Sequence, residues 1–158
     1  QYLEQGNGST SVGARFDMWK SVFIMVQEKP ILGWGTQGAP QKRHQLAEQG
    51  IISQYAGQFT HAHNQYLDDL SKRGIIGLVA FLAIFVIPLR RFMPGLKSDS
   101  AETKLIATLG TLHVLAVMIY CLSQGFFTHN SGNLFYFFLT ILWYALFTTQ
   151  QGNIKKMA

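Results

Sequence analysis

The residues best suited to chemistry stand together as His63-Asn64, just upstream of a long apolar stretch. An imidazole titrates near neutral pH and, in its neutral form, can take a proton from a hydroxyl. Apolar and charged side chains recur with helical spacing from Asn64 onward, so His63 would stand at a helix N-terminus. The free N–H groups and positive dipole end of that helix favour a nearby anion and disfavour a protonated imidazole.

Two neighbouring patterns offer other chemistry, and neither is persuasive. His61 and His63 form an H-x-H pair that could bind zinc, but a third ligand is missing and His44 is remote, so we predict no metal site. Asp68 and Asp69 are adjacent, and adjacent residues on a helix point about 100° apart. We therefore expect them to lie on a solvated helix face rather than to act as a carboxylate pair.

Three long uncharged stretches must position His63. The chain is 48% hydrophobic and 13% charged, whereas soluble domains usually carry about 25% charged residues. Spanning a bilayer takes about 20 apolar residues, and about 17 are sufficient at the lower limit. Buried helices of a soluble core are the alternative, but three such stretches in succession argue against it. The fold class expected is an all-α integral membrane protein, with three transmembrane helices preceded by a largely helical outer region.

Positive charge gives the direction of these spans. Arg90 and Arg91 follow the first span, and Lys155 and Lys156 follow the third, which favours the cytoplasm for both places. The outer side is the periplasm in a Gram-negative bacterium, and the net charge of +5 gives no reason to expect a nucleic acid partner. The predicted segments are a periplasmic loop region with amphipathic helices (1–73), transmembrane helices (74–93, 105–124 and 133–149), a cytoplasmic loop (94–104), a periplasmic loop (125–132) and a cytoplasmic tail (150–158).

The outer region contains an expected helix and an expected turn. Residues 15–27 carry aromatic and apolar side chains at helical spacing, with Ser11 as a plausible N-cap. The glycine-rich segment KPILGWGTQGAP predicts a turn and lacks the spacing of a phosphate-binding P-loop. A single helix from Asn64 through the first span would hold His63 about 16 Å above Gly74. A lipid diphosphate presents its phosphates at that depth.

Two further histidines lie in or near the spans. His113 lies mid-span, where we expect a neutral imidazole satisfied by a neighbouring helix. His129 stands beside Asn130 on the outer side, which repeats the His-Asn pair of residues 63–64.

The motifs resemble a known family. His63-Asn64, nine residues and then Gly74-Ile75-Ile76-Gly77 resembles the signature of the O-antigen ligases of lipopolysaccharide synthesis. The upstream segment ARFDMWKSVFIMVQEKPILGWG resembles that family's pattern of Arg, Trp, a helix, Pro and a Gly-x-Gly turn. Arg15 precedes His63 by 48 residues, which fits the family's large periplasmic loop. The final three spans fit as well, and the opening of the chain in polar sequence at Gln1 indicates a C-terminal piece.

The resemblance implies a metal-independent, inverting glycosyltransferase without a cofactor, in the bacterial inner membrane. It would move O-antigen from undecaprenyl diphosphate to a sugar hydroxyl of the lipid A core, facing the periplasm. By position, Arg15 would bind the donor diphosphate and His63 would be the catalytic base; Asn64, Arg43 and His129 are auxiliary candidates. The family also uses an arginine from an earlier periplasmic loop, so this piece is expected to be inactive alone.

Two other interpretations remain open from the sequence. O-antigen polymerases and the ligases that glycosylate proteins share the donor and the loop topology, so these residues separate them poorly from the lipopolysaccharide ligases. A non-enzymatic transporter or membrane assembly fragment is the alternative of another class. It predicts that Arg15 and His63 tolerate substitution while His113 does not.

Overall fold

The computed structural model describes residues 10–157, apart from the side chains of residues 153–157. Every regular element in that range is a helix, which confirms the all-α class. The chain divides into two compact units, residues 1–81 with 121–125 and residues 82–120 with 126–158. The side chains of Lys155 and Lys156, on which part of the topology prediction depends, lie outside the described part.

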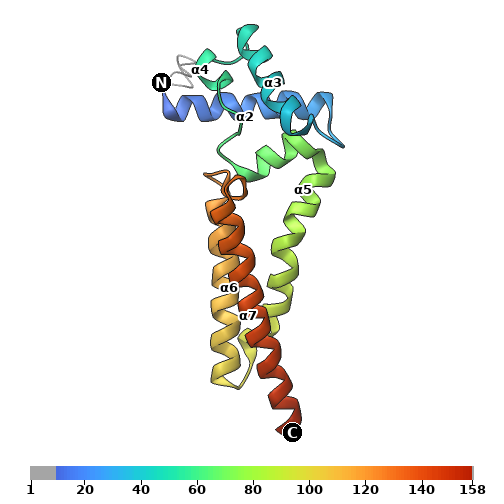
Figure 1. Ribbon diagram of the computed structural model, residues 1–158, viewed down its shortest axis with the longest axis vertical. Helices are drawn as coiled ribbons and strands as arrows, with labels where there is room; N and C mark the ends of the chain where they lie inside the picture. Colours follow the sequence, from blue (N-terminus) through green and yellow to red (C-terminus); the bar gives the residue numbers. More distant parts are fainter. Residues whose placement is uncertain (1–9, 158) are drawn as a thin grey trace. The chain divides into compact units, whose positions relative to one another are not determined.

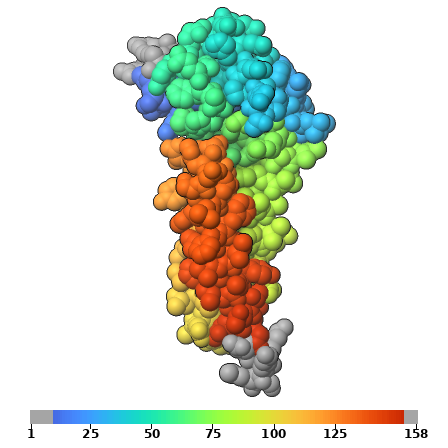
Figure 2. Space-filling model, viewed as in Figure 1, coloured from blue at the N-terminus to red at the C-terminus, as the bar shows by residue number. Residues whose placement is uncertain are grey.

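The first unit contains α2 (Ser11–Glu28), α3 (Gly35–Glu48), the short α4 (Gln54–Gly57) and the first part of α5 (Gln65–Phe92). α3 and α4 lie against α2 (Figure 1), and in the space-filling view they form one continuous surface (Figure 2). The apolar side chains buried between these helices form two small clusters: Ala14, Met18, Leu46, Ala47, Ile52 and Ala56, and then Val22, Met25, Ala39 and Ala62.

α2 departs in detail from its sequence pattern. Its N-cap is Thr10, whose Oγ1 accepts from the Gly13 N–H at 3.0 Å, so the cap expected at Ser11 is wrong by one residue. The buried face carries the smaller apolar residues of the helix. Phe16 and Phe23 are 42% and 59% exposed. The aromatic residues at helical spacing in residues 15–27 are therefore only partly buried in the core.

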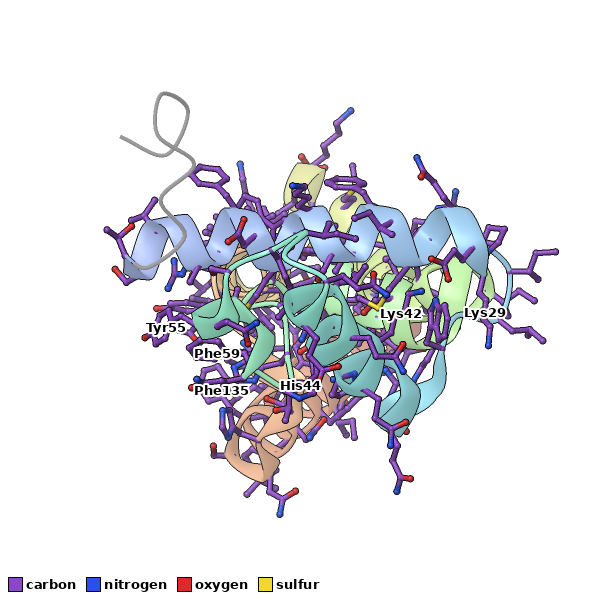
Figure 3. The ribbon with its side chains drawn as sticks, turned by 90° about the horizontal axis from the view of Figure 1, so that it is seen from above. Lys29, Lys42, His44, Tyr55, Phe59 and Phe135 are labelled. Carbon is purple, nitrogen blue, oxygen red and sulfur yellow. The ribbon has the colours of Figure 1, made fainter. Side chains whose placement is uncertain are left out.

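The glycine-rich segment is a turn only in its first half, because α3 begins at Gly35. Trp34 closes the turn: its indole N–H donates to the Met25 carbonyl at 3.0 Å. The ammonium groups of Lys29 and Lys42 lie 4.2 and 4.9 Å from the Trp34 ring centre, and Figure 3 shows both lysines at this end of α2. The turn therefore has a fixed conformation.

α5 is broken at Gly74, which has φ 64° and ψ −163°, so the single continuous helix expected from Asn64 through the first span is wrong. The turn that follows α2 supplies the missing hydrogen bonds on both sides of the break. The Trp34 N–H donates to the Ser71 carbonyl at 2.9 Å, and the Ile75 N–H donates to the Pro30 carbonyl at 2.9 Å. These are groups that a broken helix would otherwise leave unpaired.

The second unit contains the rest of α5, η1 (Met93–Lys97), α6 (Ala101–Tyr120), η2 (Phe126–Thr128) and α7 (Asn130–Met157). α6 and α7 run side by side (Figure 1). Three helices are long and apolar enough to cross a membrane, over residues Gln65–Lys97, Ala101–Tyr120 and Asn130–Gly152. Residues 121–124 lie beyond the end of α6, although the predicted second span includes them.

His113 is satisfied by a neighbouring helix, as expected. Its Nε2–H donates to the Tyr136 carbonyl of α7 at 3.2 Å, and the two rings stack with centres 5.6 Å apart. The Tyr136 hydroxyl in turn donates to the Ile84 carbonyl of α5 at 2.7 Å. Polar side chains thus link the helices of this unit.

Candidate functional site

His63-Asn64 forms a sharp corner at the start of α5. His63 has φ 48°, in the left-handed region that side chains other than glycine rarely adopt. Asn64 is the N-cap, since its Oδ1 accepts from the Leu67 N–H at 3.1 Å. The asparagine thereby starts the helix. Asn64, one of the auxiliary candidates, therefore has a structural role at the helix start.

Residues 121–124 hold the other side of this corner. The Gln65 N–H donates to the Cys121 carbonyl at 2.8 Å, and the Asn64 Nδ2 donates to the Leu122 carbonyl at 3.1 Å. The imidazole of His63 also forms a hydrogen bond with the Gln124 side chain. The sequence interpretation missed Gln124 because hydropathy assigned this segment to the second span; its polar Ser123-Gln124 ending was the available signal.

The backbone of Ala62, directly before His63, is fixed on both sides. Its carbonyl accepts from the Trp19 indole N–H of α2 at 3.0 Å. Its N–H donates to Asp68 Oδ1 of α5 at 3.2 Å. Ala62 is fully buried, so the backbone of this residue links α2 and α5 inside the fold and leaves His63 little freedom to move.

The expectation that Asp68 and Asp69 are solvated is wrong, because they are 2% and 3% exposed. Each is paired with a cation one turn later on α5. Lys72 Nζ lies 2.6 Å from Asp68 Oδ2, and Arg73 pairs with Asp69. A carboxylate can be buried when it is paired and hydrogen-bonded in this way. The spacing of four residues was visible in the sequence, but it is equally common on solvated helices.

The positive charge of Arg15 acts on His63. Arg15 stands one turn before Trp19 on α2, and so shares the helix face that contacts Ala62. Burial lowers the pKa of His63 below its ordinary value of 6.5, and the positive charge of Arg15 is the next largest cause. The hydrogen bond to Gln124 acts in the opposite direction. Two candidate residues 48 positions apart in the sequence are thus linked electrostatically in the fold.

The ring of His63 is held from several sides. The rings of Phe59 and His63 meet edge to face at 5.4 Å, and Figure 3 shows Phe59 beside Tyr55 of α4. His63 Nδ1 is buried and has no hydrogen-bond partner within the described residues. The lone pair of this nitrogen is therefore not engaged by a donor of the described residues, and the atom is covered from solvent in this structure.

Arg43 lies inside the fold rather than at an open surface. It is fully buried, its Nε donates to Ser21 Oγ at 3.1 Å, and its Nη1 donates to the Phe59 carbonyl at 2.8 Å. Burial lowers its pKa, and Asp68 opposes that effect. Arg43 therefore links α2 and α3 with the segment before His63, and its charge helps to lower the His63 pKa.

The remaining histidines differ in their surroundings. The rings of His61 and His63 are 4.3 Å apart, and burial, followed by the charge of His63, lowers the His61 pKa. Within residues 10–157 no group of three or more histidine, cysteine, aspartate or glutamate side chains is gathered as metal ligands would be. His129 belongs to the second unit and is exposed, with its carbonyl accepting from the Asn133 side chain at 3.1 Å.

Comparison with known proteins places the chain in a family. Residues 2–82 match the family described as O-antigen ligase. An uncharacterized protein of Haemophilus influenzae is 41% identical over 136 residues, which cover 86% of this chain and 34% of that protein. The chain thus spans about a third of that relative's length. The family match includes the helix of Arg15, the corner of His63 and the break at Gly74, and the chain belongs to the O-antigen ligase family.

Proposed function

We propose that the chain is the C-terminal portion of an O-antigen ligase, which transfers a glycan from undecaprenyl diphosphate to a sugar hydroxyl of the lipid A core. The observation that carries the proposal is that Trp19, one turn after Arg15 on α2, donates to the carbonyl of Ala62, the residue before His63, at the start of a helix long enough to cross a membrane. A guanidinium binds phosphate oxygens as a rigid fork. An imidazole of lowered pKa is neutral at neutral pH, and only the neutral form can accept a proton.

The reaction needs one base and one cation from this chain. His63 takes the proton of the acceptor hydroxyl, whose oxygen attacks the anomeric carbon of the donor glycan. The bond between that carbon and the diphosphate oxygen breaks, and the diphosphate leaves with both electrons of the bond. Arg15 stabilises the charge that develops on the leaving group. Attack opposite the leaving group inverts the anomeric centre.

The same assignment places the site at the periplasmic face of the inner membrane. His63 directly precedes α5, and the break at Gly74 marks the beginning of the uncharged stretch of that helix. Phosphates of a lipid carrier lie at this depth in a bilayer. We propose no metal in the mechanism, because a base and a guanidinium supply both functions that the displacement needs; ligation should therefore continue in a chelator.

Substitutions in the full-length enzyme test the two roles separately. His63→Ala should abolish ligation while membrane insertion stays intact. Arg15→Lys should retain part of the activity and Arg15→Glu none, because only the positive charge can bind the diphosphate. His44→Ala is the matched control, since His44 is an exposed histidine of α3 paired with Glu48. Ligation that persists in Arg15→Glu would exclude a diphosphate contact there.

The acceptor is tested by deleting the parent gene and separating the lipopolysaccharide on a gel. Loss of the long ladder with accumulation of the lipid-linked precursor supports ligation to lipid A core. A ladder reduced to one repeat unit would show a polymerase instead, and loss of glycan from a protein would show a protein-glycosylating ligase.

A further inference from the structure

We propose that Asp68 is the positioning residue of this site: its buried carboxylate, held by Lys72, fixes the Ala62–His63 backbone and thereby orients the imidazole. The inference rests on the proposed function, because it assigns Asp68 a task only if His63 is the base. It gives a role to a buried ion pair that the mechanism above does not use.

The two carboxylate oxygens of Asp68 have different partners. Oδ1 accepts from the Ala62 N–H at 3.2 Å, and Oδ2 accepts from Lys72 Nζ at 2.6 Å. Asp68 and Lys72 are 2% and 9% exposed. The Lys72 bond prevents the carboxylate from turning, so Oδ1 stays directed at the peptide that precedes His63.

The His63 conformation requires such a restraint. A histidine at φ 48° persists only where its surroundings over-determine the backbone. Both peptide units of the preceding residue, Ala62, are restrained, the one that follows it by Trp19 at the carbonyl and the one that precedes it by Asp68 at the N–H. Removal of either contact frees one of these two peptide units to rotate, and the imidazole then moves with the backbone.

Asp68 also has an electrostatic effect on the imidazole. The positive charges of Arg15 on α2 and Arg43 on α3 favour the neutral form of His63, and the ring of His61 lies 4.3 Å from its ring. The Asp68 carboxylate raises the His63 pKa against them. Loss of this negative charge should make His63 a weaker base and move the acid limb of the activity profile to lower pH.

Asp69 provides a matched control on the same helix. It is buried to the same degree and is paired at the same spacing, but its carboxylate binds Arg73 and Gln65 within α5 itself. Removing its charge therefore disturbs an ion pair of α5, whose carboxylate is buried and whose Arg73 side chain is 55% exposed, without removing the restraint on Ala62.

The test compares Asp68→Asn and Asp69→Asn in the full-length enzyme, with undecaprenyl diphosphate-linked glycan as donor and lipid A core as acceptor. Asp68→Asn should lower kcat about 100-fold, the cost of a catalytic group misplaced by about 1 Å. KM for the donor should stay unchanged, because Arg15 is intact, and the acid limb should move to lower pH. Asp69→Asn should leave kcat and the acid limb unchanged.

A double variant separates geometry from charge. Asp68→Asn with Lys72→Met leaves no unpaired ammonium, and the Asn oxygen can accept from the Ala62 N–H. The double variant should regain most of kcat, while its acid limb stays at the lower pH. If the Asp68→Asn protein does not accumulate, the double variant is used in its place. Equal kcat and equal profiles for Asp68→Asn and Asp69→Asn would overturn the inference alone, whereas ligation by His63→Ala would overturn the proposed function.

Discussion

The contact between the turn after α2 and the break in α5 predicts that Gly74→Ala is severely destabilising. Gly74 has φ 64° and ψ −163°, a region of backbone conformation that is essentially restricted to glycine. A Cβ added to it would lie 2.1 Å from the Ile31 carbonyl oxygen. That oxygen belongs to the backbone, so it cannot rotate away as a flexible side chain would.

Two costs combine in this substitution. A residue other than glycine held in such a conformation costs about 1 to 3 kcal/mol. Displacing tightly packed atoms to admit an extra methyl group costs typically about 1 to 3 kcal/mol more. Gly74→Ala should therefore lower the free energy of unfolding by about 2 to 6 kcal/mol, a large part of the total stability of an ordinary domain.

Two other glycines isolate the separate costs. Gly35 has φ 78° with no atom within 4 Å of an added Cβ, so Gly35→Ala should show only the conformational cost, about 1 to 2 kcal/mol. Gly38 lies within α3, and its added Cβ would be 3.7 Å from the Trp34 Cβ. Because alanine is the better helix former by about 1 kcal/mol, Gly38→Ala should be neutral or stabilising.

The assay is the free energy of unfolding of the purified full-length protein in mild detergent, supported by hydrogen exchange at Ile75. That amide donates to the Pro30 carbonyl at 2.9 Å and should lose protection in Gly74→Ala. Equal losses of stability in Gly74→Ala and Gly35→Ala, with Ile75 still protected, would refute the interpretation of this contact.

Three further predictions concern the corner at His63. Asn64→Ala removes the N-cap and should cost about 1 kcal/mol in the free energy of unfolding, whereas Asn64→Asp, which keeps the capping oxygen, should cost less. Trp19→Phe leaves the buried Ala62 carbonyl unpaired, so it should cost about 1 to 3 kcal/mol and lower kcat as well. Because the His63 pKa lies below 6.5, ligation should be constant near neutral pH and fall as the imidazole is protonated in more acidic buffer. Arg15→Gln should raise that pKa, since it removes a cation; because this variant should be inactive, the pKa is read from an NMR titration of the His63 imidazole, and a lower value would contradict the electrostatic effect assigned to Arg15.

The fold class could be predicted from the sequence because hydropathy is a property of whole stretches. Long uncharged stretches must be shielded from water wherever they lie in the chain. Three such stretches therefore predict three candidate spans and an all-helical chain. The break at Gly74 could not be predicted in this way. Residues 65–80 contain no proline and fit one helix, and the break depends on a turn some 40 residues earlier in the sequence that supplies hydrogen bonds to it.

The site was predictable where side-chain type carries the chemistry and unpredictable where burial does. Arg15 and His63 could be singled out through motif resemblance. Asp68 could not, because a carboxylate four residues before a lysine is the ordinary pattern of a solvated helix face. Its burial depends on the packing of α2 and α3 around the corner, and no local pattern encodes that packing.

The two segments that resemble the family, residues 14–35 and residues 63–77, contact each other at two separate points. These contacts explain why the two motifs occur together. At the first point Trp19 donates to the Ala62 carbonyl. At the second, an added Cβ on Gly33 would lie 2.6 Å from the Gly74 nitrogen, so only two glycines allow this approach. One contact would leave α2 free to pivot about α5, whereas two contacts fix its direction. The position of Arg15 relative to His63 is therefore set by residues outside the chemistry, and changes at Gly33 or Trp19 should weaken ligation without removing a catalytic group.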